Sequence, residues 1–105
     1  MKKTLLIVFL VLLIPVMLLA GDKEVVNYIN NYHNIGSNIK MYLTFASMDY
    51  DVKGLGYTIK DNGRNCLVIY HFTLDGKDEY ARWRYGKGSG IIEPLNEWAR
   101  VFMGK

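Results

Sequence analysis

The residues best suited to nucleophilic or metal chemistry are His33, His71 and the single cysteine, Cys66. A cysteine beside a histidine can form a thiolate–imidazolium couple. Cys66 and His71, however, lie five residues apart in a segment that alternates like a strand, which places them on opposite faces. Zinc needs three or four ligands at characteristic spacings, which these residues do not have. The sequence therefore predicts no catalytic residue, metal or cofactor; we expect a packed Cys66, a half-exposed sheet His71 and a solvated His33.

Carboxylates and glycines form three further motifs. Asp49 and Asp51 would share a face of an extended segment, where paired carboxylates can bind calcium or share a proton; we expect a polar loop instead. The run from Asp75 to Glu79 lacks the spaced carboxylates of an EF-hand, so a tight hairpin is expected. Residues 86–90 hold three glycines without the spacing of a phosphate-binding loop and predict a flexible connection.

The most distinctive motif combines arginines with aromatic side chains. Tyr80, Arg82 and Arg84 fall on one face of a predicted strand, and Lys87 lies just beyond its end. Arginine offers a planar set of donors and stacks on aromatic rings, and both residue types are enriched at protein interfaces. The motif predicts a partner-binding patch for a protein or an anionic envelope component. The alternative is the solvent face of an edge strand, where charge opposes aggregation.

The N-terminus carries the pattern of an export signal. Lys2 and Lys3 precede an apolar run from Leu5 to Leu19, and Ala20 ends it before a polar boundary. The run holds about 15 residues, fewer than the roughly 20 that a spanning helix needs. The sequence predicts a signal peptide over residues 1–20 and an exported protein, in the periplasm, at the cell surface or outside the cell. The alternative is a membrane anchor retained through residues 4–20.

Composition limits the remaining chain, residues 21–105, to one small domain. Cleavage after Ala20 would leave 11 basic against 10 acidic residues, which gives nucleic-acid binding no support. A single cysteine excludes an intramolecular disulfide, so stability must come from the core. Eight tyrosines, four phenylalanines and two tryptophans can supply it.

Helical periodicity marks both ends of this domain. Near its start, Asp22 is a plausible N-cap, and apolar residues recur with spacings of three and four. Gly36 and Ser37 interrupt this pattern, which leaves two alternatives. Either one bent helix covers residues 22–47, or a helix ends near Asn34 and a new element, which could be a strand, begins at Asn38. We favour the bent helix. At the other end, Pro94 predicts the first turn of a closing helix that Gly104 caps. The apolar positions of the two helices are Val25, Ile29, Tyr32, Ile35, Ile39, Tyr42 and Ala46, then Leu95, Trp98, Val101 and Phe102.

Between the helices, the chain alternates like an antiparallel meander of three to four strands. Residues 55–59, 65–74 and 78–85 alternate, and the segments 61–63 and 75–77 carry turn residues between them. Residues 65–74 have two apolar faces, which indicates a central strand. The predicted fold is α+β, with an N-terminal helix, this meander and a short C-terminal helix on the sheet. The layout is similar to that of small cystatin-like and NTF2-like folds, a likeness that implies no function.

Three functions are compatible with these features. The favoured hypothesis is a small exported binding module without enzymatic activity, such as an inhibitor or immunity-type protein. The second is a membrane-anchored envelope accessory protein. The third is a small ligand-binding enzyme with a pocket between helix and sheet that uses His71 or an aspartate. The last is disfavoured because no site geometry is visible.

Overall fold

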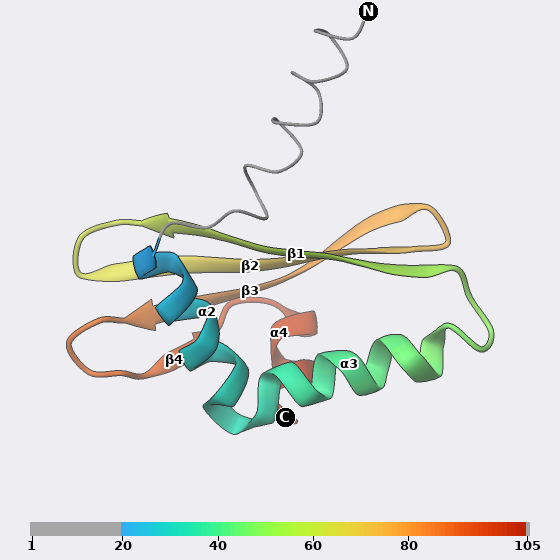
Figure 1. Ribbon diagram of the computed structural model, residues 1–105, viewed down its shortest axis with the longest axis horizontal. Coiled ribbons are helices and arrows are strands. Elements are labelled where there is room, and N and C mark those ends of the chain that lie inside the picture. The colour runs from blue at the N-terminus through green and yellow to red at the C-terminus, as the bar shows by residue number, and fades with distance from the viewer. Residues whose placement is uncertain (1–19, 105) are drawn as a thin grey trace, which may run out of the picture.

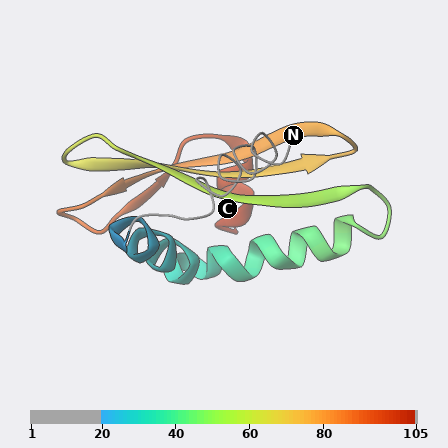
Figure 2. The same cartoon turned by 45° about the horizontal axis from the view of Figure 1, so that its top comes forward.

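The computed structural model describes residues 20–104, which form an α+β fold. Helices α2 (Ala20–Asn31) and α3 (Ile35–Ala46) are joined by a 3-10 turn (Tyr32–Asn34) and run beside the sheet (Figure 1). Figure 2 shows the two helices as a layer on one side of the strands. The short helix α4 (Glu97–Phe102) contacts the third strand and α3. The predicted α+β architecture is confirmed.

The sheet has four antiparallel strands in sequence order. They are β1 (Val52–Asp61), β2 (Asn65–Leu74), β3 (Lys77–Gly86) and β4 (Ile92–Pro94). The β2–β3 turn is a two-residue hairpin, because Leu74 pairs with Lys77 and both intervening residues have positive φ. In β1 the register shifts between Gly54 and Gly56. The predicted meander is confirmed, with β2 in a central position.

The N-terminal helix bends two residues earlier than expected. His33 and Asn34 have φ values of 49° and 59°, so the break lies there and Gly36 lies within α3. The preference for a helix that continues past Gly36 is confirmed, and the alternative of a strand from Asn38 is wrong. Helical spacing prevails because it buries Ile35 and Ile39 together. The N-cap prediction for Asp22 is wrong, since α2 begins at Ala20 and Asp22 lies in its first turn.

One face of the sheet carries the hydrophobic core. Phe72 of β2 lies within ring-packing distance of Tyr42, Trp98 and Phe102, with centroids 5.1–6.2 Å apart. Its strand neighbours on that face, Cys66, Val68 and Tyr70, are buried as well, while the alternate residues are half-buried. Rings bury large areas, so this cluster joins both helical ends of the chain to the sheet. We call this side the inner face and the opposite side the outer face.

The closing helix starts later than the sequence indicated. Pro94 pairs with Trp83 in β4, so the expectation that it opens a helix is wrong. Asn96 caps α4 instead, because its Oδ1 accepts from the amide of Ala99 at 3.1 Å. The same oxygen accepts from the Arg82 amide at 3.1 Å, and Nδ2 donates to the Tyr80 carbonyl at 2.9 Å. Asn96 therefore fastens α4 to β3.

The expected signal peptide or anchor over residues 1–20 lies outside the described residues except for Ala20. Within residues 20–104, no helix combines the length and the apolar character required to cross a bilayer.

Candidate functional site

The outer face holds three of the four residues of the predicted binding patch. Strand register places Tyr80 opposite His71, Arg82 opposite Ile69 and Arg84 opposite Leu67. Ala81 and Trp83 alternate with them and are fully buried on the inner face. The prediction that Tyr80, Arg82 and Arg84 share one face of the strand is thus confirmed. The alternative of an edge strand is wrong around Arg84, because β4 pairs with β3 from Trp83 to Tyr85.

Two cations of the predicted patch are paired with carboxylates. Arg84 Nη1 lies 2.8 Å from Glu93 Oε1, its neighbour on β4. Lys87 Nζ donates to Asp61 Oδ2 at 2.6 Å, beyond the end of the patch. That hydrogen bond lowers the pKa of Asp61 and raises the pKa of Lys87. Both pairs are solvent-exposed, so they reduce the free positive charge here more than they stabilise the fold.

Arg82 is held differently. Its guanidinium carbon lies 5.8 Å from the ring centroid of Tyr80, which is 44% exposed. Its Nε atom is buried and has no hydrogen-bond partner among residues 20–104. Half-buried Ile69 lies across on β2, and Leu95 donates its amide to the Arg82 carbonyl at 2.8 Å. Buried polar groups in proteins are nearly always paired, so this Nε is an exception, and the guanidinium makes no ion pair with the described residues.

The residues considered for catalysis do not come together. His71 is half-buried on the outer face, with Nε2 2.8 Å from Thr58 Oγ1. Cys66 is 3% exposed on the inner face, and burial raises the pKa of its thiol. His33 is exposed at the break between α2 and α3. Their separation excludes a direct Cys66–His71 couple, and the described part of the chain contains no cluster of acidic, histidine or cysteine residues able to hold a metal.

The two loop motifs are structural. The Asp51 amide donates to Asp75 Oδ1 at 2.9 Å, and the Asp75 amide donates to the Asp51 carbonyl at 2.7 Å. Asp49 lies in the turn before β1, as the expectation of a polar loop requires, and the alternative of two facing carboxylates on an extended segment is wrong. The glycine-rich segment, expected to be flexible, is a hydrogen-bonded β3–β4 turn. There the Gly90 amide donates to the Gly86 carbonyl at 2.8 Å, and Tyr28 Oη donates to the Gly90 carbonyl at 2.6 Å.

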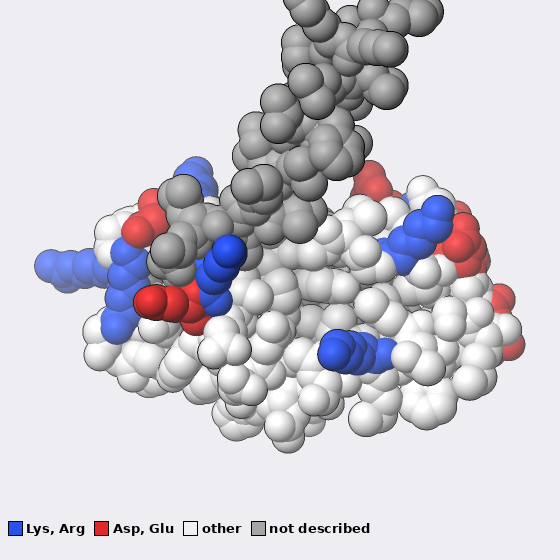
Figure 3. Space-filling view, viewed as in Figure 1, with Lys and Arg blue, Asp and Glu red and all other residues white. Residues whose placement is uncertain are grey.

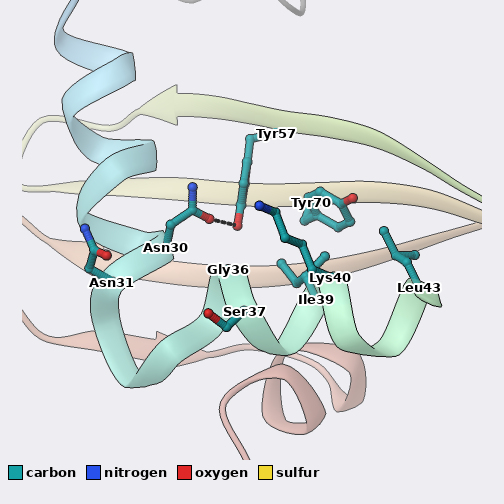
Figure 4. A pocket seen from close by; sticks show the side chains of 9 residues that line it. All are labelled: Asn30, Asn31, Gly36, Ser37, Ile39, Lys40, Leu43, Tyr57 and Tyr70. Carbon is teal, nitrogen blue, oxygen red and sulfur yellow. Dashed lines mark hydrogen bonds between the residues drawn. The ribbon is translucent and has the colours of Figure 1, made fainter. Parts of the chain in front are cut away.

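A cleft of about 350 Å³ opens on the inner side, between the α2–α3 bend and strands β1 and β2 (Figure 4). Tyr57 Oη donates to Asn30 Oδ1 at 2.7 Å across it, and Lys40 extends from α3 toward β1. Figure 3, in the view of Figure 1, shows charged side chains gathered toward the two ends of the molecule and few between them. The cleft is lined by Asn30, Asn31, Gly36, Ser37, Ile39, Lys40, Leu43, Tyr57 and Tyr70.

The sequence did not predict this cleft; only the disfavoured enzyme hypothesis placed a pocket between helix and sheet, with His71 or an aspartate in it. Neither His71 nor an aspartate lines it. Its polar side chains are spread over residues 30–70, so no short motif signals them. The weak signal was Gly36, read as an interruption of the helical pattern. In the structure this glycine makes room for Asn30, as a Cβ at position 36 would lie 2.9 Å from Asn30 Cβ.

An exposed apolar stripe completes the candidate surfaces. Met41 and Phe45 lie one turn apart on α3 and are 55% and 61% exposed. Met48, in the turn after α3, is 72% exposed. Methionine and aromatic residues are enriched at protein interfaces, and exposed apolar groups of this kind mark contact surfaces. We call Met41, Phe45 and Met48 the α3 stripe.

Comparison of this chain with family models, curated proteins and solved structures found no match. The similarity of layout to cystatin-like and NTF2-like folds therefore stays an expectation from the sequence.

Proposed function

We propose that this protein is a small exported binding module without catalytic activity, and that its partner is a protein that docks on the outer face of the sheet. The observation that carries the proposal is Arg82, which is half-buried over Tyr80 and makes no ion pair with the described residues. A carboxylate from a docking protein would accept from the guanidinium and leave Tyr80 stacked beneath it. Export rests on the N-terminal sequence pattern alone.

The charges favour a protein over an anionic polymer as the partner. A polyanion is bound by a row of unpaired cations. On this face, however, Arg84 is paired with Glu93, and Lys87 is paired with Asp61 beyond the patch. Half-buried Ile69 lies opposite Arg82 on β2, and Tyr80 lies beside it. An arginine next to apolar and aromatic side chains is the arrangement typical of an interface centre.

Site-specific photocrosslinking in cells that carry the full chain tests this proposal. Benzoylphenylalanine replaces Tyr80 on the outer face or, as a matched control, Tyr50, an exposed tyrosine after α3. We expect a covalent adduct of defined mass from position 80 alone, and its loss when Arg82→Gln is added. Arg100→Gln, in an exposed arginine of α4, should leave the adduct unchanged. Adducts from position 50 alone, from neither position, or unaffected by Arg82→Gln would contradict the proposal.

A membrane-anchored accessory protein is the second candidate, and the α3 stripe favours it. Exposed Met41, Phe45 and Met48 could lie against a bilayer surface to which residues 4–20 tether the chain. The intact mass of the protein in soluble and membrane fractions separates the candidates. A soluble species that begins at Gly21 supports the exported module, whereas a membrane species that retains Met1 and resists alkaline extraction supports the anchored protein.

A further inference from the structure

We infer that the cleft between α3 and strands β1 and β2 binds a small acidic sugar, a hexose-sized ring that carries one carboxylate. The site lies on the inner side of the sheet, away from Tyr80 and Arg82, so it is independent of the docking proposal. Its volume of about 350 Å³ falls at the small end of the range for ligand pockets. Four features of the described residues support it.

Two glycines give the cleft its shape. A Cβ at Gly36 would lie 2.9 Å from both Cβ and Oδ1 of Asn30. A Cβ at Gly54 would lie 2.3 Å from the Tyr70 hydroxyl and 3.0 Å from Leu43 Cδ1. Contacts this short are not tolerated in a packed structure. The side chains of Asn30 and Tyr70 therefore take these positions because position 36 and position 54 have none.

The cleft has hydrogen-bond capacity that the protein leaves unused. Tyr57 Oη donates its proton to Asn30 Oδ1, which leaves the tyrosine oxygen free to accept and the amide Nδ2 free to donate. Tyr70 is 8% exposed, and its hydroxyl points toward the Leu43 side, away from Asn30, Tyr57 and Lys40 (Figure 4). Burial raises the pKa of both tyrosines, so each hydroxyl keeps its proton at neutral pH. The Asn30 amide, the Tyr57 oxygen and the Lys40 ammonium lie close together (Figure 4), and such a set matches a molecule rich in hydroxyl groups.

The charge of the cleft selects an anion. Lys40 is the sole charged residue in the lining, and it makes no ion pair with the described residues. Its ammonium extends toward Tyr57 across the opening (Figure 4). No carboxylate in the lining could hold the ammonium of an amino acid. A phosphate calls for several strong donors, whereas one lysine suits a single carboxylate.

The aromatic rings that line the cleft indicate that the ligand contains a ring with an apolar side. Tyr57 and Tyr70 pack edge to face with centroids 5.0 Å apart, and both line the cleft. A sugar ring has an apolar C–H side that packs on aromatic carbon while its hydroxyls bond at the edge. A purely polar small acid would leave this surface unmatched. The combination of rings, amide, hydroxyl and one ammonium therefore points to an acidic sugar.

Titration with D-glucuronate, followed by amide and side-chain NMR, tests the inference on protein expressed as the full chain. D-Glucose serves as the neutral control ligand. We expect saturable shifts at Asn30, Lys40 and Tyr57, and about tenfold weaker binding of glucose, because the charge-assisted hydrogen bond is missing. Lys40→Gln should weaken glucuronate about tenfold and abolish the preference over glucose. Lys60→Gln, in an exposed lysine of β1 that does not line the cleft, should leave both affinities unchanged.

Tyr57→Phe removes the oxygen that faces Asn30 and Lys40 while it keeps the ring, and it should weaken both sugars alike. The inference is overturned if glucuronate causes no saturable shift in the cleft, if Lys40→Gln binds it as well as the parent, or if the shifts lie on the outer face alone. The ligand could be a free uronic acid or the end of a polymer of uronic acids, and titration with an oligouronate separates the two. If the oligouronate binds at least as tightly as glucuronate does, the ligand is a polymer end. If it does not bind, the ligand is the free acid.

Discussion

The outer face and the inner cleft contain the same kinds of residue in different geometries. Each combines a tyrosine with a cation and apolar side chains, Tyr80 with Arg82 outside and Tyr57 with Lys40 inside. On the outer face the side chains lie side by side on a sheet surface, which suits a partner of similar breadth. In the cleft, the bend between α2 and α3 and the close approach at Gly36 and Gly54 place the side chains around a cavity. Residue type therefore sets the chemistry of each surface, whereas local backbone shape sets the size of the ligand that fits it.

The largest expected difference between the two sides is in stability. Phe72→Ala, on the inner face, should lower the free energy of unfolding by about 3–5 kcal/mol, because it opens a cavity among four packed rings. Ile69→Ala, on the outer face of the same strand, should lower it by about 1 kcal/mol, because half-buried area contributes less. Urea unfolding measures both. Equal losses would mean that the outer face is as tightly packed as the core.

Gly54→Ala tests whether a glycine shapes the cleft. The new Cβ would meet the Tyr70 hydroxyl at 2.3 Å, so we expect a loss of about 1–3 kcal/mol in the free energy of unfolding. Adding Tyr70→Phe removes the clashing oxygen and should restore part of the lost free energy of unfolding. A double-mutant cycle measures the coupling between the two substitutions. The control is Gly88→Ala, where no atom lies within 4 Å of the added Cβ. A neutral Gly54→Ala would show that the cleft adapts and is not built around this glycine.

The pH dependence of stability in Tyr57→Phe tests whether the Tyr57 hydroxyl is buried in the cleft. At neutral pH the variant should lose about 1 kcal/mol with the hydrogen bond to Asn30. Burial raises the folded-state pKa of Tyr57 above its ordinary value of 10.0, so above that pH the unfolded state loses a proton that the folded state keeps. The parent therefore loses stability as pH rises above about 10, while Tyr57→Phe escapes this contribution.

Urea unfolding between about pH 7 and about pH 11 measures the free energy of unfolding of the parent and of Tyr57→Phe. The difference between these two free energies should shrink as the pH rises. A constant difference across this range would place the hydroxyl in water rather than inside the cleft. Asn30→Ala is the companion variant, since it removes the acceptor and leaves the tyrosine in place.

The smallest expected effect concerns the exposed pair of Asp61 and Lys87. The hydrogen bond from Lys87 lowers the pKa of Asp61, so Lys87→Met should raise that pKa toward its ordinary value, as carboxyl NMR would measure. The pair favours the folded state above the unfolded pKa of Asp61 and is lost as pH falls through the folded value. Stability at neutral pH should hardly change, because both groups are exposed. An unchanged pKa of Asp61 would mean that Lys87 is free to bind an anion.

Sequence reasoning succeeded where the signal is local. The alternation of residues 65–74 separates Cys66 and Phe72 from His71 without any knowledge of the fold, and Asp75–Gly76 identifies its own turn. It failed where two local preferences compete. Pro94 suits a helix start as well as a strand, and pairing of β4 with β3 decided between them.

The bend between α2 and α3 could not be placed from sequence for a similar reason. Gly36 has the stronger preference for breaking a helix, yet His33 and Asn34 take the positive φ values. Core packing explains the choice, because a break at that point allows both Ile29 and Ile35 to be fully buried. Gly36 is then used for close approach to Asn30 rather than for the turn.

The α+β class, the central strand, the shared face of Tyr80, Arg82 and Arg84, and the burial of Cys66 all followed from local patterns in the chain. Periodicities of two and 3.6 residues fix which side chains share a face, whatever the rest of the chain does. Two further features depend on how the elements pack together. Arg84 is paired while Arg82 is not, and Asn30, Lys40 and Tyr57 meet at one cleft. These relations join elements far apart in the chain, and the packing of the helices against the sheet sets them.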